Sequence, residues 1–251
     1  MKNKKIRHKT WTNPQKIEFY ELLANSGNHC LIAGTTGSGK SVLLNNCIDY
    51  LLCTQTPKEI NFIFFDPKIV ELSRYKNMVH CIGYYNDIIN INGIMRGLIT
   101  EMNNRYRYMD HYNLQTYPGN RILIVVDEVA DLLTAYGDES KKFSKYIQIL
   151  LAKSRAANIN FLLCTQAPRR DIISGKLLIN VPTRCALRCS TQIESRQIIN
   201  QSGAENLPKW GQCYLLSPDL TQIKLYAFDM KDKNLIQNDI NLWCKGGDMV
   251  L

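Results

Sequence analysis

Short apolar runs alternate along the chain with longer segments of helical periodicity. The segment Arg121–Val126 is apolar and β-branched at most positions, which is typical of a strand buried on both faces. In residues 40–53 the apolar side chains instead recur three or four positions apart, as on one face of a helix. This alternation predicts an α/β fold with a mostly parallel central sheet flanked by helices. The predicted strands are 29–34, 61–65, 79–85, 121–126, 160–165, 183–190, 212–216 and 224–228, and the predicted helices are 40–53, 87–110 and 141–157.

The first twelve residues differ from the rest of the chain. They are rich in lysine and arginine, and we expect a flexible basic tail over residues 1–12. Thr12 or Asn13 then caps a helix that has Pro14 at its first position. Residues 13–251 have the size of a single domain. We expect its last element to be a helix at residues 231–244.

The composition indicates an intracellular protein. The longest apolar run, at 122–126, is too short for a membrane span, and no secretory signal is recognisable at the N-terminus. The nine cysteines are scattered without a C-x-x-C pair, which favours buried thiols in a reducing compartment. We therefore expect a cytoplasmic protein without a membrane span.

The net charge of +9 is unevenly distributed. Residues 1–10 carry five basic and no acidic side chains, and residues 141–209 carry twelve basic against three acidic ones, so the remainder is acidic. A localised basic region in an acidic body favours a polyanionic partner such as nucleic acid. A solvated basic face is the alternative that charge alone leaves open.

One segment fits the phosphate-binding pattern G-x-x-x-x-G-K-[ST] in full, between a predicted strand and a predicted helix. Glycines let the backbone curve around phosphate oxygens, and the helix N-terminus adds partial positive charge. Lys40 is expected to reach the β- and γ-phosphates, and Ser41 to bind Mg²⁺. The predicted nucleotide-binding residues are Gly34, Thr35, Thr36, Gly37, Ser38, Gly39, Lys40 and Ser41.

Two carboxylates follow the buried strand that ends at Val126. Asp127 is predicted to hold Mg²⁺ together with Ser41, and Glu128 to orient or deprotonate an attacking water. No Asn-Lys-x-Asp segment for reading guanine is present, so ATP is the expected nucleotide. Gln166 ends a strand expected beside that of Asp127, where it would sense the γ-phosphate; a structural polar side chain is the alternative.

Six segments, in order, resemble the motor domain of the FtsK/SpoIIIE DNA translocases, which are RecA-like P-loop ATPases of the HerA/FtsK type. The resemblance covers roughly residues 25–230, and the order of the matches makes it more specific than any single motif. The matching segments are 33–41; Asp66-Pro67-Lys68 with Glu71-Leu72; 101–106; 127–133; 152–159 with Thr165-Gln166 and Pro168; and 182–184 with Ser195-Arg196 and 203–205.

The resemblance implies an ATPase that assembles as a homo-oligomeric ring, usually a hexamer, around double-stranded DNA. Nucleotides then lie between subunits, and Arg155 matches the arginine that reaches the γ-phosphate of the neighbour. Chemistry agrees, because an arginine supplied in trans stabilises the charge of the transition state. The resemblance thus adds Arg155 to the catalytic residues predicted above, Lys40, Glu128 and Gln166.

The predicted DNA contacts depart from the family pattern. Relatives commonly carry basic residues where this chain has Ala167, Leu178 and Gln192. Arg169, Arg170 and Lys176 lie nearby, and Arg196 is retained. We expect residues 168–176 to form a pore loop whose basic groups grip phosphates without reading sequence. A solvated loop is the alternative.

These observations predict a motor that hydrolyses ATP to move double-stranded DNA. The closest alternative is a coupling or packaging ATPase of a plasmid, phage or integrative element, which hands single- or double-stranded DNA to a partner. A nucleotide-switched ring scaffold is a second alternative, which Glu128 disfavours because a switch needs no activated water. A small-molecule kinase is a third. A partner protein that supplies targeting is a further partner to consider.

Overall fold

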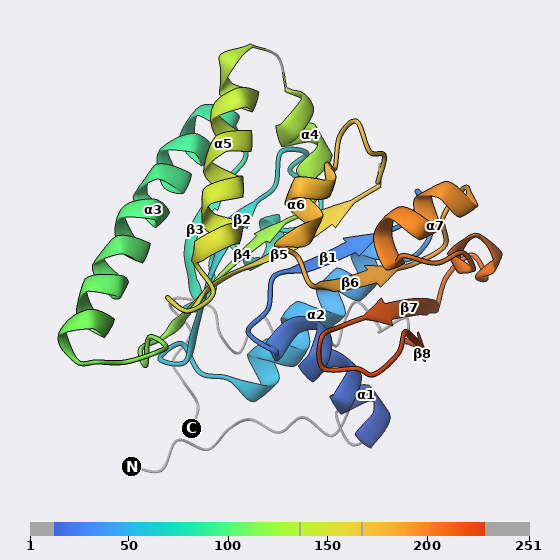
Figure 1. The fold of residues 1–251 in the computed structure, drawn as a ribbon, viewed down its shortest axis with the longest axis horizontal. Helices are drawn as coiled ribbons and strands as arrows, with labels where there is room; N and C mark the ends of the chain where they lie inside the picture. The colour runs from blue at the N-terminus through green and yellow to red at the C-terminus, as the bar shows by residue number, and fades with distance from the viewer. Residues whose placement is uncertain (1–12, 136, 167, 229–251) are drawn as a thin grey trace.

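The structure is a computed structural model that describes residues 13–135, 137–166 and 168–228. The basic tail predicted at 1–12 and the helix predicted at 231–244 lie outside these residues, as does Ala167. In the described ranges, eight strands form one sheet in the order β3-β2-β4-β5-β1-β6-β7-β8 (Figure 1). The strands are β1 Cys30–Ala33, β2 Ile60–Phe65, β3 Cys81–Tyr85, β4 Arg121–Val126, β5 Ile159–Thr165, β6 Thr183–Ala186, β7 Gln212–Leu216 and β8 Lys224–Ala227.

The sheet is mostly parallel, as the sequence predicts. Neighbouring strands from β3 to β6 all pair in parallel, whereas β7 pairs antiparallel with β6 and β8 antiparallel with β7. Strand β5 lies between β1 and β4, with Ala33 opposite Thr165 and Val126 opposite Leu163. The carboxyl ends of these three strands therefore meet at one edge, where ligands bind in open α/β sheets.

Helices cover both faces of the sheet and bury separate hydrophobic clusters. On one face, α1 and α2 pack on residues such as Phe64 and Leu162, and on the other α3, α5, α6 and α7 pack on Phe161 and their neighbours. Figure 1 shows the long helices α3 and α5 side by side on that second face. The helices are α1 Pro14–Tyr20, α2 Lys40–Thr54, α3 Ile88–His111, α4 Val129–Thr134, α5 Asp138–Lys153, α6 Gly175–Ile179 and α7 Gln192–Ile199, with shorter helical turns at Glu21–Asn25, Ser73–Tyr75 and Ala204–Asn206.

Local chemistry explains where the elements begin and end. Asn13 caps α1, as predicted, and its carboxamide oxygen accepts a hydrogen bond from the Gln15 backbone N–H. Helix α5 begins earlier and ends earlier than the prediction of 141–157, because Asp138 and Glu139 favour its N-terminus and Asn158 adopts a positive φ of 56° before β5. Strand β6 ends at Ala186, four residues before the end of the predicted strand 183–190.

Among the described residues, no helix combines the length and the apolar character needed to cross a membrane.

Candidate active site

The phosphate-binding pattern folds into a tight loop between β1 and α2. Gly34 leaves no room for a side chain, because a Cβ there would lie 2.7 Å from the Ser38 Oγ and 2.8 Å from the Leu187 Cβ. Gly39 has φ 93°, a conformation that side chains disfavour, and directly precedes the first turn of α2. The loop is fixed to the neighbouring strand end, because the Thr35 N–H donates to the Arg188 carbonyl over 2.9 Å.

Six of the eight predicted loop residues line one pocket of about 260 Å³, and Gly34 and Ser38 are not part of its lining. Lys40 and Ser41 lie in the first turn of α2, and Gln166 approaches from the end of β5. The buried Ser38 Oγ has no hydrogen-bond partner in the described part of the chain, which is the condition expected where a ligand supplies the partner. The pocket is lined by Thr35, Thr36, Gly37, Gly39, Lys40, Ser41, Val42, Gln166 and Trp210.

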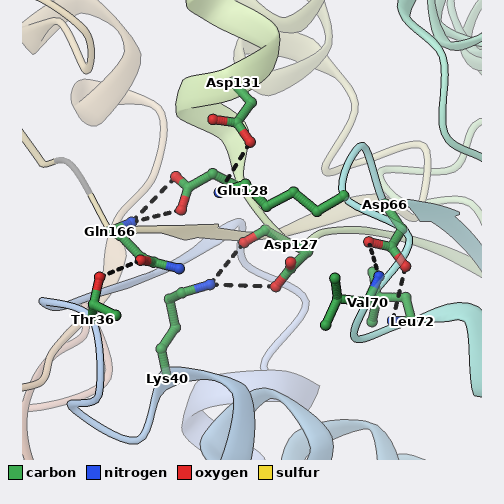
Figure 2. Close-up of polar contacts among 10 residues, drawn as sticks. Thr36, Lys40, Asp66, Val70, Leu72, Asp127, Glu128, Asp131 and Gln166 are labelled. Atoms are coloured by element: carbon green, nitrogen blue, oxygen red, sulfur yellow. Dashed lines mark hydrogen bonds and ion pairs between the residues drawn. The ribbon is translucent and has the colours of Figure 1, made fainter.

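Lys40 joins the loop to the end of β4. Its Nζ donates to the Asp127 carbonyl over 2.9 Å and lies 3.3 Å from the Asp127 Oδ1, with both side chains almost fully buried (Figure 2). Burial lowers the pKa of Lys40, but the Cys164 thiol and the carboxylates of Asp127 and Glu128 outweigh it and raise the pKa overall. Lys40 is therefore a fixed cation at the base of the pocket.

Glu128 is positioned beside the end of β5. Its carboxylate accepts hydrogen bonds from the Gln166 backbone N–H over 2.9 Å and 3.2 Å (Figure 2). The Thr165 hydroxyl donates a further hydrogen bond to it. Burial raises the pKa of Glu128 above its ordinary value, and these hydrogen bonds and the Lys40 charge oppose the shift. The Asp127 pKa is raised as well, chiefly by burial, against the opposing effect of Lys40. A carboxylate with a raised pKa is better matched to proton transfer near neutral pH.

Gln166 links the loop to Glu128. Its side-chain oxygen accepts a hydrogen bond of 2.6 Å from the Thr36 hydroxyl, while its backbone N–H is bound by Glu128. The prediction that its strand lies beside that of Asp127 is confirmed, because β5 pairs with β4. The position suits a residue that reports on the γ-phosphate, and that role stays a prediction.

The Asp66 carboxylate has a structural role in its own loop. It accepts hydrogen bonds from the backbone N–H groups of Val70 (3.3 Å) and Leu72 (3.1 Å) and from the Tyr84 hydroxyl (3.1 Å). Ile69 at the tip has φ 56°, a strained conformation for a β-branched side chain. Of the two interpretations of this segment, turn chemistry and a carboxylate near the nucleotide cleft, the contacts favour the first.

Comparison with known proteins identifies the family. The model of the FtsK/SpoIIIE family matches residues 5–120. A DNA translocase FtsK 1 of Neisseria meningitidis is 33% identical over 223 residues, covering 76% of this chain and 27% of the relative. A DNA translocase FtsK of Vibrio vulnificus is 34% identical over 227 residues, covering 76% of this chain and 23% of the relative. The chain belongs to the FtsK/SpoIIIE family.

This member of the FtsK/SpoIIIE family spans about a quarter of the length of the curated relatives it matches. Its fold is shared with the conjugation coupling protein TcpA of pCW3, solved with ATPγS, at a TM-score of 0.74 and 24% identity, covering 86% of this chain and 64% of that one. The cytoplasmic domain of the type VII secretion ATPase EccC of Thermomonospora curvata aligns at 0.71 and 21% identity, covering 88% and 28%. The predicted fold class, an α/β fold of the RecA-like P-loop NTPase type with a mostly parallel central sheet flanked by helices, is confirmed.

Arg155 lies apart from the pocket of its own chain. It is exposed in the turn between α5 and β5, and its Nη1 donates to the Asn28 Oδ1 over 3.1 Å. Asn28 precedes β1, whereas the phosphate loop follows β1, so Arg155 sits at the opposite edge of the sheet. The structure thus does not bring Arg155 together with the other predicted catalytic residues of the same chain.

Two of the predicted DNA contacts lie together. Arg170 and Arg196 line one groove of about 440 Å³, which Gly175 borders at the start of α6. Arg169 is exposed beside Asp171, 3.8 Å away. Lys176 is exposed but belongs to helix α6, so the prediction of a pore loop extending to residue 176 is wrong. Ser174 ends the loop, because its hydroxyl caps α6 by accepting from the Leu177 N–H.

Sequence reasoning missed two residues beside the pocket. Trp210 lines it, and the Lys209 Cε lies 3.6 Å from the position of a Cβ on Gly37. Both come from the turn before β7, about 170 residues beyond the loop, and no sequence motif connects the two segments. The only usable signal was the tryptophan itself, in the segment Lys209-Trp210-Gly211.

Proposed function

We propose that the chain is an ATP-driven motor that moves double-stranded DNA and hydrolyses ATP at sites shared between the subunits of a ring. The observation that carries the proposal is a set of contacts at the carboxyl edge of the sheet. Lys40 and Gln166 line one pocket, and behind them Lys40 bonds to Asp127 and the Gln166 N–H bonds to Glu128. The names of the curated relatives, DNA translocase FtsK, support the choice of DNA as the substrate.

The residues present fit ATP and Mg²⁺. The unpartnered Ser38 hydroxyl, the close approach at Gly34 and the buried Lys40 ammonium suit the phosphates of a nucleoside triphosphate. Ser41 and Asp127 would hold Mg²⁺, which prefers oxygen ligands and retains water and phosphate in its shell. Bound Mg²⁺ supplies positive charge that offsets the negative charge of the β- and γ-phosphates.

Glu128, Gln166 and Lys40 each have a separate role in hydrolysis in this proposal. The Glu128 carboxylate has lone pairs left after its bonds to Gln166 and Thr165, and with these it orients a water for attack on the γ-phosphate. Gln166 uses its carbonyl oxygen to bind Thr36 and keeps its NH₂ group as a donor for the γ-phosphate. Lys40 neutralises phosphate charge from the base of the pocket.

Arg155 completes the site of a neighbouring subunit in this proposal. Its position at the far edge of the sheet separates it from its own nucleotide, and its exposure leaves it accessible to a second copy. A ring closes this head-to-tail arrangement, because each subunit gives one edge and receives the other. A hexamer, a cytoplasmic location and a partner protein for targeting stay predictions.

The groove lined by Arg170 and Arg196 is the proposed contact for the DNA backbone. Guanidinium groups bind phosphate through two parallel hydrogen bonds, and phosphate contacts carry no base specificity. Arg169 and Lys176 do not line the groove, but they adjoin the lining residues Arg170 and Gly175 in the chain and add two exposed cations, Lys176 from α6. Reversing the charge of Arg170 and Arg196 should weaken binding to all DNA sequences alike and reduce the salt slope by about one unit per contact.

Arg107 supplies a matched control for that experiment, because it is exposed on α3 and binds only the neighbouring Asn104 in the described residues. Arg107→Glu should leave the affinity and the salt slope near wild type. If Arg170→Glu and Arg107→Glu lowered the DNA affinity equally, the groove would contribute only through the net charge of the protein and not as a specific contact.

Displacement of a third strand from duplex DNA tests the motor itself. The wild-type protein should displace the strand in the presence of ATP, and Glu128→Gln should bind ATP and DNA without displacement. Hydrolysis without displacement would instead support the coupling or scaffold alternatives.

A further inference from the structure

A large aromatic side chain lies exposed at the rim of the nucleotide pocket. Trp210 is 56% exposed, although an indole ring is among the side chains that gain most from burial. Its Cβ lies 3.5 Å from the position that a Cβ on Gly39 would take, so the indole starts directly beside the phosphate loop. It lines the same pocket as Lys40 and Ser41.

The turn that carries Trp210 is anchored on both sides. Leu207 is buried and donates its N–H to the Ala204 carbonyl over 3.3 Å, and the Gly211 carbonyl accepts from the Phe228 N–H over 2.9 Å. The buried Phe228 ring fills the space below Gly39, 3.2 Å from the same Cβ position. A fixed turn holds the indole in place before a ligand arrives, which reduces the ordering cost of binding.

The lining of the pocket combines two kinds of side chain. The Thr36 hydroxyl bonds to the Gln166 side chain, and the Gln166 backbone N–H bonds to Glu128, so the γ-phosphate is expected beside these polar groups. Trp210 and Val42 supply the apolar groups of the lining, and Val42 lies one residue beyond Ser41 in α2. When a nucleoside triphosphate binds with its phosphates on the loop, its base is the one large apolar group that the protein can shield from water.

We propose that Trp210 is the stacking platform for the nucleobase of the bound nucleotide. Bases stack on aromatic faces without readout of their edges, because every base presents a π-face. The platform therefore favours purine nucleoside triphosphates over free polyphosphate and contributes equally to ATP and GTP. This inference rests on the proposed function, in which the loop holds the triphosphate.

Lys209 gives a matched control in the same turn. Its Cε lies 3.6 Å from the position of a Cβ on Gly37, beside the phosphate loop. Its charge acts on phosphate oxygens, which ATP, GTP and inorganic tripolyphosphate all possess. Lys209→Ala should therefore lower the affinity for all three ligands by similar factors. Trp210→Ala should lower the affinity only for ATP and GTP, which carry a base.

The experiment is calorimetric titration of the full chain with Mg²⁺ and each of ATP, GTP and inorganic tripolyphosphate. Trp210→Ala should lower the affinity for ATP and GTP by about 5- to 100-fold and leave the affinity for tripolyphosphate within about twofold of wild type. Trp210→Phe should keep most of the affinity for ATP, and Trp210→Leu, which is apolar but has no aromatic face, should behave like Trp210→Ala.

A fluorescence titration supplies a second readout that needs no change at position 210. With Trp11 and Trp243 replaced by phenylalanine, ATP and GTP should quench the indole emission and tripolyphosphate should leave it unchanged. Quenching by all three ligands would contradict stacking.

Two further results would overturn the inference alone. Equal losses for ATP and tripolyphosphate in Trp210→Ala would show that the side chain only supports the loop, and full ATP affinity in Trp210→Leu would show that no ring is needed. A wild-type protein that binds neither ATP nor tripolyphosphate would instead refute the proposed nucleotide site.

Discussion

Replacement of Arg155 by alanine separates binding of ATP from its hydrolysis. The Arg155 guanidinium bonds to Asn28 on the amino side of β1, and the phosphate loop begins on the carboxyl side, after Ala33. Four residues of extended strand span about 13 Å, so a subunit's own Arg155 lies far from its own γ-phosphate. We expect Arg155→Ala to bind ATP like wild type and to lose ~10³–10⁵-fold in turnover, the range measured for arginines supplied in trans.

Mixed rings give the decisive assay. Lys40→Ala lacks its own nucleotide site but keeps Arg155, whereas Arg155→Ala keeps the site and lacks the arginine. In an equimolar mixture about one quarter of the interfaces combine an intact site with an intact neighbouring arginine, so about one quarter of wild-type ATPase activity should return. Each variant alone, at the same total concentration, is the control. A mixture as inactive as its components, or near-normal turnover by Arg155→Ala alone, would refute the shared site.

Three further outcomes follow from the contacts. Burial lowers the pKa of His29 to about 3, and the charges of Arg155 and Arg121 act in the same direction. Between pH 6.5, the ordinary pKa of a histidine, and pH 3, the unfolded state therefore binds a proton at His29 that the folded state does not bind. Unfolding titrations should therefore find the protein ~2 kcal/mol less stable at pH 5 than at pH 7 through this group, and His29→Asn, which keeps an acceptor for the Phe161 N–H, should flatten that dependence. Because burial raises the pKa of Glu128, the acid limb of turnover should lie above the usual range of a glutamate, and wild-type activity retained down to pH 4.5 would contradict this role. Arg105 is buried and donates to the backbone carbonyls of Asn120 and Ala157, so Arg105→Ala should lower the free energy of unfolding by about 3–5 kcal/mol in denaturant titrations. Arg107 is exposed, and Arg107→Ala should change that free energy by less than about 0.5 kcal/mol.

The strand and loop chemistry near the phosphates was readable from the sequence because each signal is local. The apolar run Arg121–Val126 and the two carboxylates after it lie within one short segment, and the glycines of the loop are adjacent to Lys40. The structure then places both segments at the carboxyl edge of a parallel sheet, as the alternation of strands and helices predicts.

Contacts between distant segments were not readable in the same way. Arg105 lies in the predicted helix 87–110, where no sequence signal gives it a role. In the structure it is buried and donates to the carbonyl oxygens of Asn120 (3.0 Å) and Ala157 (2.9 Å), and its guanidinium carbon lies 4.4 Å from the centre of the Tyr117 ring. Lys176 was assigned to a loop because helix α6 has only five residues, too few for a periodic signal.

Duplex-stimulated hydrolysis of ATP tests most directly whether this chain is a DNA motor. The measurement is steady-state ATPase activity without DNA, with linear double-stranded DNA and with single-stranded DNA, and Glu128→Gln serves as the inactive control. We expect strong stimulation by the duplex, weaker stimulation by the single strand, and no activity in Glu128→Gln. Hydrolysis that neither DNA form accelerates would contradict the motor, and a preference for single strands would favour the coupling ATPase.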